Sequence, residues 1–320
     1  KLGKVSLDGT KIKANASKHK ALSYAHAKKI EAQLKAEVKA LTAQAEEADQ
    51  TSVVDGMDIP AEIARRETRL KALAAAKAVI EGRAQERFER EQADYHSKQE
   101  KRQAQRDAGK KPKGREPKPP QPGPKDKEQV NLTDEASRIM PVSGGGFEQC
   151  YNAQASVDTE TMLVMSTHVT QATNDKQQIE SALENLAALP DKLGKVTDLL
   201  GDTGYFSANN VALCVKADIQ PLLAIARDHH HRSVFEQFSP DTPAPETDDP
   251  LLLMEHRLTT QAGRTLYALR KQTVEPVFGI IKQVMGFRQF SMRGLDKVSG
   301  EWTLVTLAWN LKRMNVLRMA

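Results

Sequence analysis

The sequence is poor in cysteine and in long apolar runs, and each shortage excludes a class of protein. Its 320 residues include only 2 cysteines, Cys150 and Cys214, with no CxxC pattern, which excludes a disulfide scaffold or a cysteine zinc site. No apolar run reaches the roughly 18 residues that a membrane span needs, so we expect no membrane partner. Few cysteines suit a reducing compartment, and we expect a cytoplasmic protein.

The chain also lacks an initial methionine and a signal peptide, since it begins Lys1-Leu2-Gly3-Lys4. We therefore expect a fragment of a longer protein. With 39% hydrophobic and 28% charged residues, its length is sufficient for one large or two ordinary domains with a real core. This composition excludes a disordered chain.

Outside one segment the chain has almost no basic excess. The net charge is +5, but the segment from Lys98 to Glu128 alone holds 11 Lys or Arg against 5 Asp or Glu. Six prolines between Pro112 and Pro124 exclude a helix there and favour an extended, polyproline-like linker. Two interpretations remain open, a plain spacer or a segment that lies along phosphates.

Two amphipathic helices are predicted before this linker. Apolar residues recur at helical spacing from Ile30 to Ala45, and again from Ile63 to Ala84 after a break at residues 49–60. Asp58 and Pro60 suit a helix start. Two such helices joined by a short loop indicate an antiparallel helical hairpin, with apolar residues spaced roughly as in a coiled coil.

The rest of the chain mixes strand and helix patterns. Residues 146–169 alternate as a β-hairpin, and 195–200 and 220–226 have the pattern of short buried strands. Helices are predicted at 175–189, 207–217, 273–286 and 299–315, the last with Trp302 and Trp309 in the core. The order favours an α/β fold, a mixed sheet flanked by helices.

One strand pattern, Val5–Ile12, precedes the helical hairpin. Because an isolated strand of this size is not stable, we infer that it belongs to the later sheet. The predicted domains follow from this inference: 1–14 as the first strand of the core, 15–97 as an inserted helical hairpin, 98–130 as the basic linker, and 131–320 as the remainder of the core.

Three carboxylates are candidates for a metal site. Asp8 lies in a buried strand, Asp202 follows an apolar strand, and Glu275 lies in a predicted helix. Carboxylates at neighbouring strand ends converge, and three of them could hold two divalent ions about 3.5–4 Å apart, with magnesium suited to an oxygen-only site. The spacing leaves another interpretation open, in which Asp8-Gly9 is a turn and Asp202 and Glu275 stabilise helix starts.

The segment Tyr267–Lys282 resembles the Tyr-Arg-Glu-Lys signature of bacterial insertion-sequence DDE transposases, which have a ribonuclease-H-like catalytic core. Other stretches are similar to that family, and the resemblance covers residues 1–15 and 131–320. The other similar stretches are Ser6-Leu7-Asp8-Gly9-Thr10-Lys11, Asn131-Leu132-Thr133-Asp134, Tyr151-Asn152-Ala153-Gln154, Gly201-Asp202-Thr203-Gly204-Tyr205 and Arg288-Gln289-Phe290-Ser291-Met292-Arg293-Gly294-Leu295.

The resemblance implies a catalytic triad of Asp8, Asp202 and Glu275 that binds two magnesium or manganese ions, cuts transposon ends and joins a DNA 3′-hydroxyl to target DNA. It also implies DNA as partner, a dimer within the DNA complex, and a bacterial cytoplasmic protein that associates with the nucleoid through DNA. In the family, a segment that usually recognises the transposon ends precedes this core, and we expect it to be missing here.

The same resemblance implies that the other signature residues, Tyr267, Arg270 and Lys282, contact phosphates. Four residues separate Arg270 from Glu275 where the family has three, so Lys271 is an alternative for that role. Pro276 threatens the continuity of the helix. Glu275 and Lys282 lie on one helix face, with Gly279 leaving room for a DNA backbone. Arg288 and Arg293 are further candidates for DNA contact.

Three alternatives stay open. The chain could be an inactive transposase remnant, a coiled-coil DNA-binding or assembly protein, or another two-metal nuclease of the same fold. Carboxylates roughly 10 Å or more apart would exclude the two-metal interpretation. His229-His230-His231 has the pattern of a polar loop after the 222–226 strand, because consecutive residues cannot all face one ion.

Overall fold

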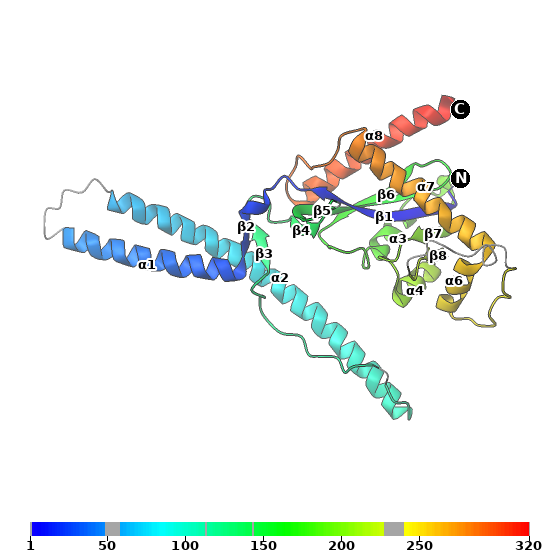
Figure 1. Cartoon of the computed structure of the whole chain (residues 1–320), viewed down its shortest axis with the longest axis horizontal. Coiled ribbons are helices and arrows are strands. Elements are labelled where there is room, and N and C mark those ends of the chain that lie inside the picture. The colour runs from blue at the N-terminus through cyan, green and yellow to red at the C-terminus, as the bar shows by residue number, and fades with distance from the viewer. Residues whose placement is uncertain (1, 49–57, 113, 143, 227–239, 320) are drawn as a thin grey trace. The chain divides into compact units, whose positions relative to one another are not determined.

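The computed structural model describes residues 2–48, 58–112, 114–142, 144–226 and 240–319 (Figure 1). The chain divides into two compact units. One, which we call the sheet unit, comprises Lys1–Lys18 and Thr133–Ala320, and the other, the helical unit, comprises His19–Leu132. The predicted histidine loop at 229–231 lies outside the described residues.

The sheet unit contains a six-stranded mixed sheet in the order β4-β5-β1-β7-β8, with β6 also paired to β5. As inferred from the instability of an isolated strand, β1 pairs with strands far along the chain, antiparallel to β5 and parallel to β7. β7 in turn pairs parallel with β8, and β5 antiparallel with β4 and β6. The strands are β1 Lys4–Lys13, β4 Arg138–Pro141, β5 Phe147–Asp158, β6 Val164–Thr170, β7 Asp198–Gly201 and β8 Gln220–Leu223.

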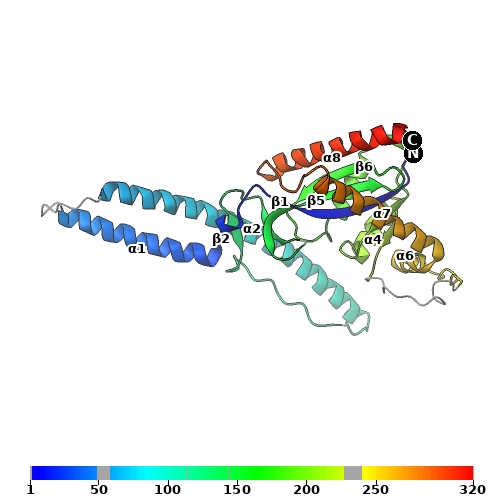
Figure 2. The same ribbon diagram turned by 45° about the horizontal axis from the view of Figure 1, so that its top comes forward.

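Helices cover both faces of this sheet (Figures 1 and 2). On one face α7 and α8 bury an apolar cluster that includes Tyr151, Phe278 and Trp302. On the other, α3, α4 and α6 pack over Leu7 and Leu199. These helices are α3 Ile179–Ala187, α4 Ala208–Lys216, α6 Pro250–Thr259, α7 Gln261–Gln283 and α8 Leu295–Met319, and a short 3-10 turn, η2, spans Asp191–Leu193. The α/β fold class with a mixed sheet flanked by helices is thus the predicted one.

Helix α7 differs from the prediction. It begins at Gln261, well before the expected residue 273, with Thr260 accepting a hydrogen bond from the Gly263 amide as its N-cap. It also continues through Pro276, although a proline inside a helix favours a break. A proline removes one helical hydrogen bond, but Val274 and Val277 on either side are fully buried, and this packing holds the helix together.

The helical unit is built on two helices, α1 Tyr24–Ala48 and α2 Ile59–Asp107. Asp58 caps α2 as predicted, accepting from the Ala61 amide at 3.0 Å. Leu34, Leu73 and Ile80 pack between the helices. α2 runs ten residues beyond the predicted boundary at 97, because the sequence has no proline between Pro60 and Pro112 and is rich in helix formers. A small two-stranded sheet completes the unit, with strands β2 Ala21–Ser23 and β3 Gln129–Asn131, and the 3-10 turn η1, Lys18–Lys20, begins at the boundary between the two units.

The proline-rich segment returns alongside α2. Arg87 donates to the Gly123 carbonyl at 2.8 Å and pairs with Glu128, and Arg106 pairs with Glu116 at 2.9 Å. The linker is therefore attached to the helix at both ends. None of the described helices combines the length and hydropathy that crossing a membrane requires.

Candidate active site

Two neighbouring strands and one helix carry the three candidate carboxylates. The parallel register places Lys4 beside Asp198 and Ser6 beside Leu200, so the next outward step along both strands brings Asp8 beside Asp202, just past the end of β7. α7 packs on the same face of the sheet as Ile12 and carries Glu275. The fold therefore brings together residues that lie far apart in the sequence.

Arg270 lies among all three carboxylates. Its Nη2 is 2.8 Å from Asp8 Oδ2 and 3.6 Å from Asp202 Oδ2, and its Nη1 is 3.2 Å from Glu275 Oε1. The Arg270 side chain is 9% exposed. One oxygen of each acid thus lies within 3.6 Å of a single guanidinium, so the three carboxylates are gathered around one side chain.

The surroundings shift the charge states of this cluster. Burial raises the pKa of Asp8 to about 6, with the Asp202 charge adding to the rise and Arg270 opposing it. Burial disfavours the Arg270 charge, yet Asp8 and Asp202 raise the pKa of Arg270 above its ordinary value. Glu275 is about half exposed, so the cluster opens to solvent on the α7 side.

The donor set fits a hard divalent ion in its chemistry, because it consists of carboxylate oxygens only. Within the described ranges, no group of three or more His, Cys, Asp or Glu is arranged to hold an ion as it stands. Arg270 supplies the positive charge among these carboxylates instead.

A family model described as Transposase DDE domain matches residues 120–311, well over half of the chain. The chain belongs to the transposase DDE domain family. No curated protein and no solved structure matches it. The matched range includes Asp202, Arg270 and Glu275 but not Asp8, so in this transposase domain only the three-dimensional structure brings the first carboxylate to the others.

Arg270 and Lys271 are the two candidates for the arginine of the signature. In this transposase domain the structure brings Arg270 to the acids and leaves Lys271 exposed on the helix surface. Lys282 lies on the same helix. Its Nζ donates to Thr10 Oγ1 at 2.5 Å and to the Lys11 carbonyl at 3.1 Å, and burial lowers the pKa of its ammonium. Tyr267 is half-buried near Arg270.

The remaining predicted cations, Arg288 and Arg293, are exposed beyond the end of α7. Arg288 Nε donates to the Lys282 carbonyl at 3.1 Å, and Arg293 Nε donates to the Asn15 carbonyl at 2.9 Å. Among the described contacts, neither side chain reaches any of the three carboxylates.

Sequence reasoning missed the polar residues behind Asp8. Asn152 and Gln154 are completely buried on β5, and both donate to Asp175 Oδ1. Gly9 lies inside β1 rather than in the turn that Asp8-Gly9 suggested. A signal was present, because amide side chains that alternate along a strand predicted to be buried require buried partners.

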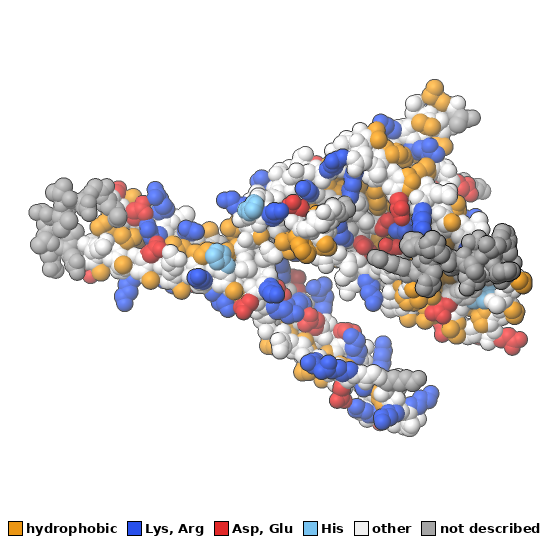
Figure 3. Space-filling view, in the orientation of Figure 1, with side chains coloured by type: hydrophobic (Ala, Val, Ile, Leu, Met, Phe, Trp, Pro, Cys, Tyr) orange, Lys and Arg blue, Asp and Glu red, His pale blue; other side chains and the backbone are white. Residues whose placement is uncertain are grey.

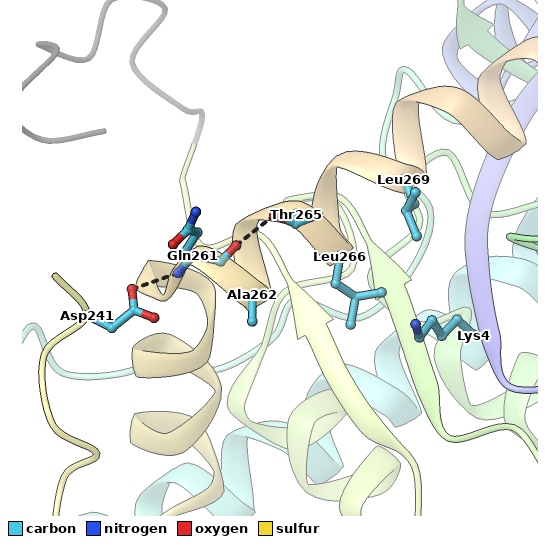
Figure 4. Close-up of a pocket in the computed structure, with 7 residues that line it drawn as sticks. All are labelled: Lys4, Asp241, Gln261, Ala262, Thr265, Leu266 and Leu269. Carbon is cyan, nitrogen blue, oxygen red and sulfur yellow. Dashed lines mark hydrogen bonds between the residues drawn. The ribbon is translucent and has the colours of Figure 1, made fainter. Parts of the chain in front are cut away.

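A hollow of about 560 Å³ opens beside the first turns of α7 (Figure 4). Asp241 Oδ1 accepts a hydrogen bond from the Gln261 amide at 2.7 Å there, and Thr265 donates to the Gln261 carbonyl. The hollow includes none of the three candidate carboxylates. Its lining residues are Lys4, Asp241, Gln261, Ala262, Thr265, Leu266 and Leu269.

Proposed function

We propose that this chain is the ribonuclease-H-like catalytic core of an insertion-sequence DDE transposase, interrupted after its first strand by the helical hairpin. The observation that carries the proposal is the convergence of Asp8, Asp202 and Glu275 on one guanidinium, from two adjacent strands and a helix of a transposase-family chain. Cytoplasmic location and association with the nucleoid through DNA belong to the same proposal.

In this proposal Asp8, Asp202 and Glu275 hold two Mg²⁺ or Mn²⁺ ions. When bound, such ions lower the pKa of a water and stabilise a leaving oxygen. Arg270 offsets the mutual repulsion of the three carboxylates and so keeps them within reach of one another. Because Asp202 and Glu275 are partly exposed, DNA reaches the cluster from the solvent side.

The proposed reaction has two in-line displacements. Water first attacks a phosphodiester at the transposon end, forming a new P–O bond while the 3′-oxygen leaves as a hydroxyl. That 3′-hydroxyl then attacks a target phosphodiester, and the target's own 3′-oxygen leaves. No protein-linked intermediate forms, so the chain needs no nucleophilic side chain.

Six further residues are proposed to bind DNA. Lys282 and Tyr267, on α7 with Glu275, contact phosphates near the cleaved end, and Arg270 faces the same region from within the cluster. Lys271, Arg288 and Arg293 are exposed and extend the positive surface. We propose that two copies act together in the DNA complex, one at each transposon end.

Loss of magnesium-dependent strand cleavage in Asp202→Ala, with folding retained, tests the function. The full-length protein first captures genomic fragments, and a shared flanking inverted repeat defines the substrate. Undiminished cleavage by the variant would remove Asp202 from the site. Asp248→Ala, at an exposed loop carboxylate, is the matched control and should cleave normally.

The alternatives are less well supported. An inactive remnant is not favoured because all three acids are present and gathered around one cation. Another nuclease is distinguished by a second assay, since it would cut DNA without joining a supplied 3′-hydroxyl end to target DNA.

A further inference from the structure

A fourth carboxylate, Asp175, lies behind the strand that carries Asp8, and the proposed chemistry does not use it. Its Oδ1 accepts hydrogen bonds from Asn152 Nδ2 at 2.7 Å and from Gln154 Nε2 at 2.6 Å. The Lys11 ammonium lies 3.8 Å from the same oxygen. Both amide side chains are completely buried, and such groups cost about 1–3 kcal/mol each when left without a partner. Asp175 therefore satisfies two amides that the fold has removed from water.

The network packs directly against the backbone next to Asp8. Gly9 stands opposite Gln154 in the β1–β5 register. A methyl group built on Gly9 would lie 2.1 Å from Gln154 Nε2 and 2.6 Å from Asp175 Oδ1. The amide and the carboxylate thus occupy the space that a side chain would take, and they support β1 one residue after Asp8.

The same network reaches the loop that carries Asp202. Gln154 Oε1 accepts a hydrogen bond from the Tyr205 hydroxyl, and burial raises the pKa of Tyr205, which keeps that hydroxyl a donor. A methyl group on Gly204 would lie 2.9 Å from Asp202 Oδ1 and 3.7 Å from Asp175 Oδ2. One carboxylate therefore lies against the backbone beside both aspartates.

We propose that Asp175 is a positioning residue: through Gln154 and Asn152 it sets the separation of Asp8 and Asp202. The inference rests on the proposed function for the roles of those two aspartates. In this role Asp175 acts as a hydrogen-bond acceptor, because its Oδ1 accepts hydrogen bonds from both amides at 2.7 and 2.6 Å. The Asp175 side chain is about 20% exposed.

The test compares Asp175→Ala, Asp175→Asn and Asp248→Ala in the full chain. Hydrogen exchange is measured first, in chelator and without DNA. We expect Asp175→Ala to speed exchange about tenfold in peptides covering 5–13 and 199–206 while α8 stays unchanged. Asp175→Asn keeps an acceptor oxygen for the amides and should restore protection. Wild-type exchange in Asp175→Ala, or an equal effect of both substitutions, overturns the inference.

Kinetics give the second measurement. Misplacing one aspartate should lower kcat about tenfold or more in Asp175→Ala and leave KM for DNA unchanged, with Asp175→Asn close to wild type. A general loss of folding would also lower the apparent kcat at unchanged KM, because fewer molecules are active, but unlike the proposed effect it would speed exchange in α8 as well. If the wild type does not cleave DNA, the proposed function fails, but the exchange result still tests whether Asp175 holds the backbone beside Asp8 and Asp202.

A separate observation concerns the helical unit. Three of the five acids in the segment Lys98–Glu128 are already paired: Glu116 with Arg106, Asp126 with Lys28 and Glu128 with Arg87. Seven exposed cations of the segment take part in no ion pair between described residues. They are Lys101, Lys110, Lys111, Arg115, Lys118, Lys125 and Lys127. Figure 3 shows Lys and Arg side chains gathered over the end of α2 and the linker.

We infer that this set of seven, the basic strip, binds the phosphates of duplex DNA. The strip is presented on a fixed support, because Lys101 lies on α2 and the linker that carries the other six is held along α2 by Arg87 and by the pair of Arg106 with Glu116. Cations on an anchored, extended segment lose less conformational freedom on binding than cations on a free tail. A plain spacer would need neither the attachments nor the local pairing of the acids.

Salt-dependent binding of a duplex of about 30 base pairs, measured in chelator, tests the strip without requiring cleavage. Neutralising Lys110, Lys111, Arg115 and Lys118 to glutamine should weaken binding and reduce the slope of log K against log salt by about 0.9 for each phosphate that the variant no longer neutralises. The control neutralises Lys29, Lys39, Arg69 and Lys71, exposed cations of the same unit. An unchanged slope in the strip variant, or an equal change in both, overturns the assignment.

Discussion

The guanidinium of Arg270 and the carboxylate of Asp8 lie 2.8 Å apart, although 262 residues separate them along the chain. This pair joins α7 to β1, and the same guanidinium also reaches Asp202 and Glu275. The proposed active site therefore has a cation built into its centre, and the stability of the site should depend on that cation and its neighbours.

Arg270→Gln should destabilise the sheet unit in the absence of divalent ions. Removing one partner of a buried pair leaves carboxylates that repel one another, and we expect a loss of about 2–4 kcal/mol, reduced because Asp202 and Glu275 are partly exposed. Urea unfolding followed by Trp302 and Trp309 fluorescence measures it. Lys271→Gln, next along the helix but exposed, should change stability by less than about 0.5 kcal/mol. Equal effects of the two would contradict the central role of Arg270.

The Asp8 carboxyl should make the stability of the metal-free protein depend on pH. Its pKa is raised from 3.8 to about 6, so the folded state holds a proton that the unfolded state releases. The stabilisation is fully present below pH 3.8 and is lost as pH rises through about 6. Relative to Asp8→Asn, the wild type should lose on the order of 2–3 kcal/mol over this range. Unfolding at several pH values in chelator measures the difference, and a constant difference would contradict the shift.

Gly9→Ala should destabilise the site through the Asp175 network that packs against β1. The added methyl group would overlap Gln154 Nε2 at 2.1 Å and force the Asp175 network apart. Such overpacking typically costs about 1–3 kcal/mol. At Gly3, near the start of the same strand, the added methyl would come no closer than 4.0 Å to Thr197, so Gly3→Ala is a matched control. Thermal unfolding of both variants checks the prediction, which fails if Gly9→Ala is as stable as the control.

Lys282→Ala should weaken binding to transposon-end DNA and make it less dependent on salt. If the ammonium contacts one phosphate, the slope of log K against log salt should fall by about 0.9. Lys297→Ala, at an exposed lysine of α8, should leave the slope unchanged. Titrations at several salt concentrations decide the matter, and equal slopes for wild type and Lys282→Ala would argue against phosphate contact.

Gly279→Ala should have opposite effects on stability and on DNA binding. A methyl group there meets nothing within 4 Å, and alanine in an exposed helix interior should stabilise α7 by about 0.5–1 kcal/mol. If the DNA backbone passes close to this glycine, the same variant should bind transposon-end DNA more weakly. Thermal unfolding and DNA titration are measured together. Higher stability with unchanged binding would place the DNA elsewhere on the helix.

Local patterns accounted for much of the fold. The alternation of Val5–Ile12 and of residues 146–169 predicted strands that are present, and Asp58 with Pro60 predicted where α2 begins. These features depend on neighbouring residues and on the two periodicities of helix and strand. The helix boundaries were less accurate, because α2 and α7 extend wherever the sequence tolerates a helix and packing supports it.

The sequence by itself indicated most of the strands and helices, though not α6 or the short strands β2, β3 and β4, together with the three candidate carboxylates and the resemblance to DDE transposases. Only the tertiary structure decided that Arg270 rather than Lys271 meets the acids, and that Asp175 lies behind Gly9. The reason is physical. Which of two adjacent helix residues faces the sheet depends on how α7 packs, and a carboxylate finds buried amides across a sheet only when the strands are in register.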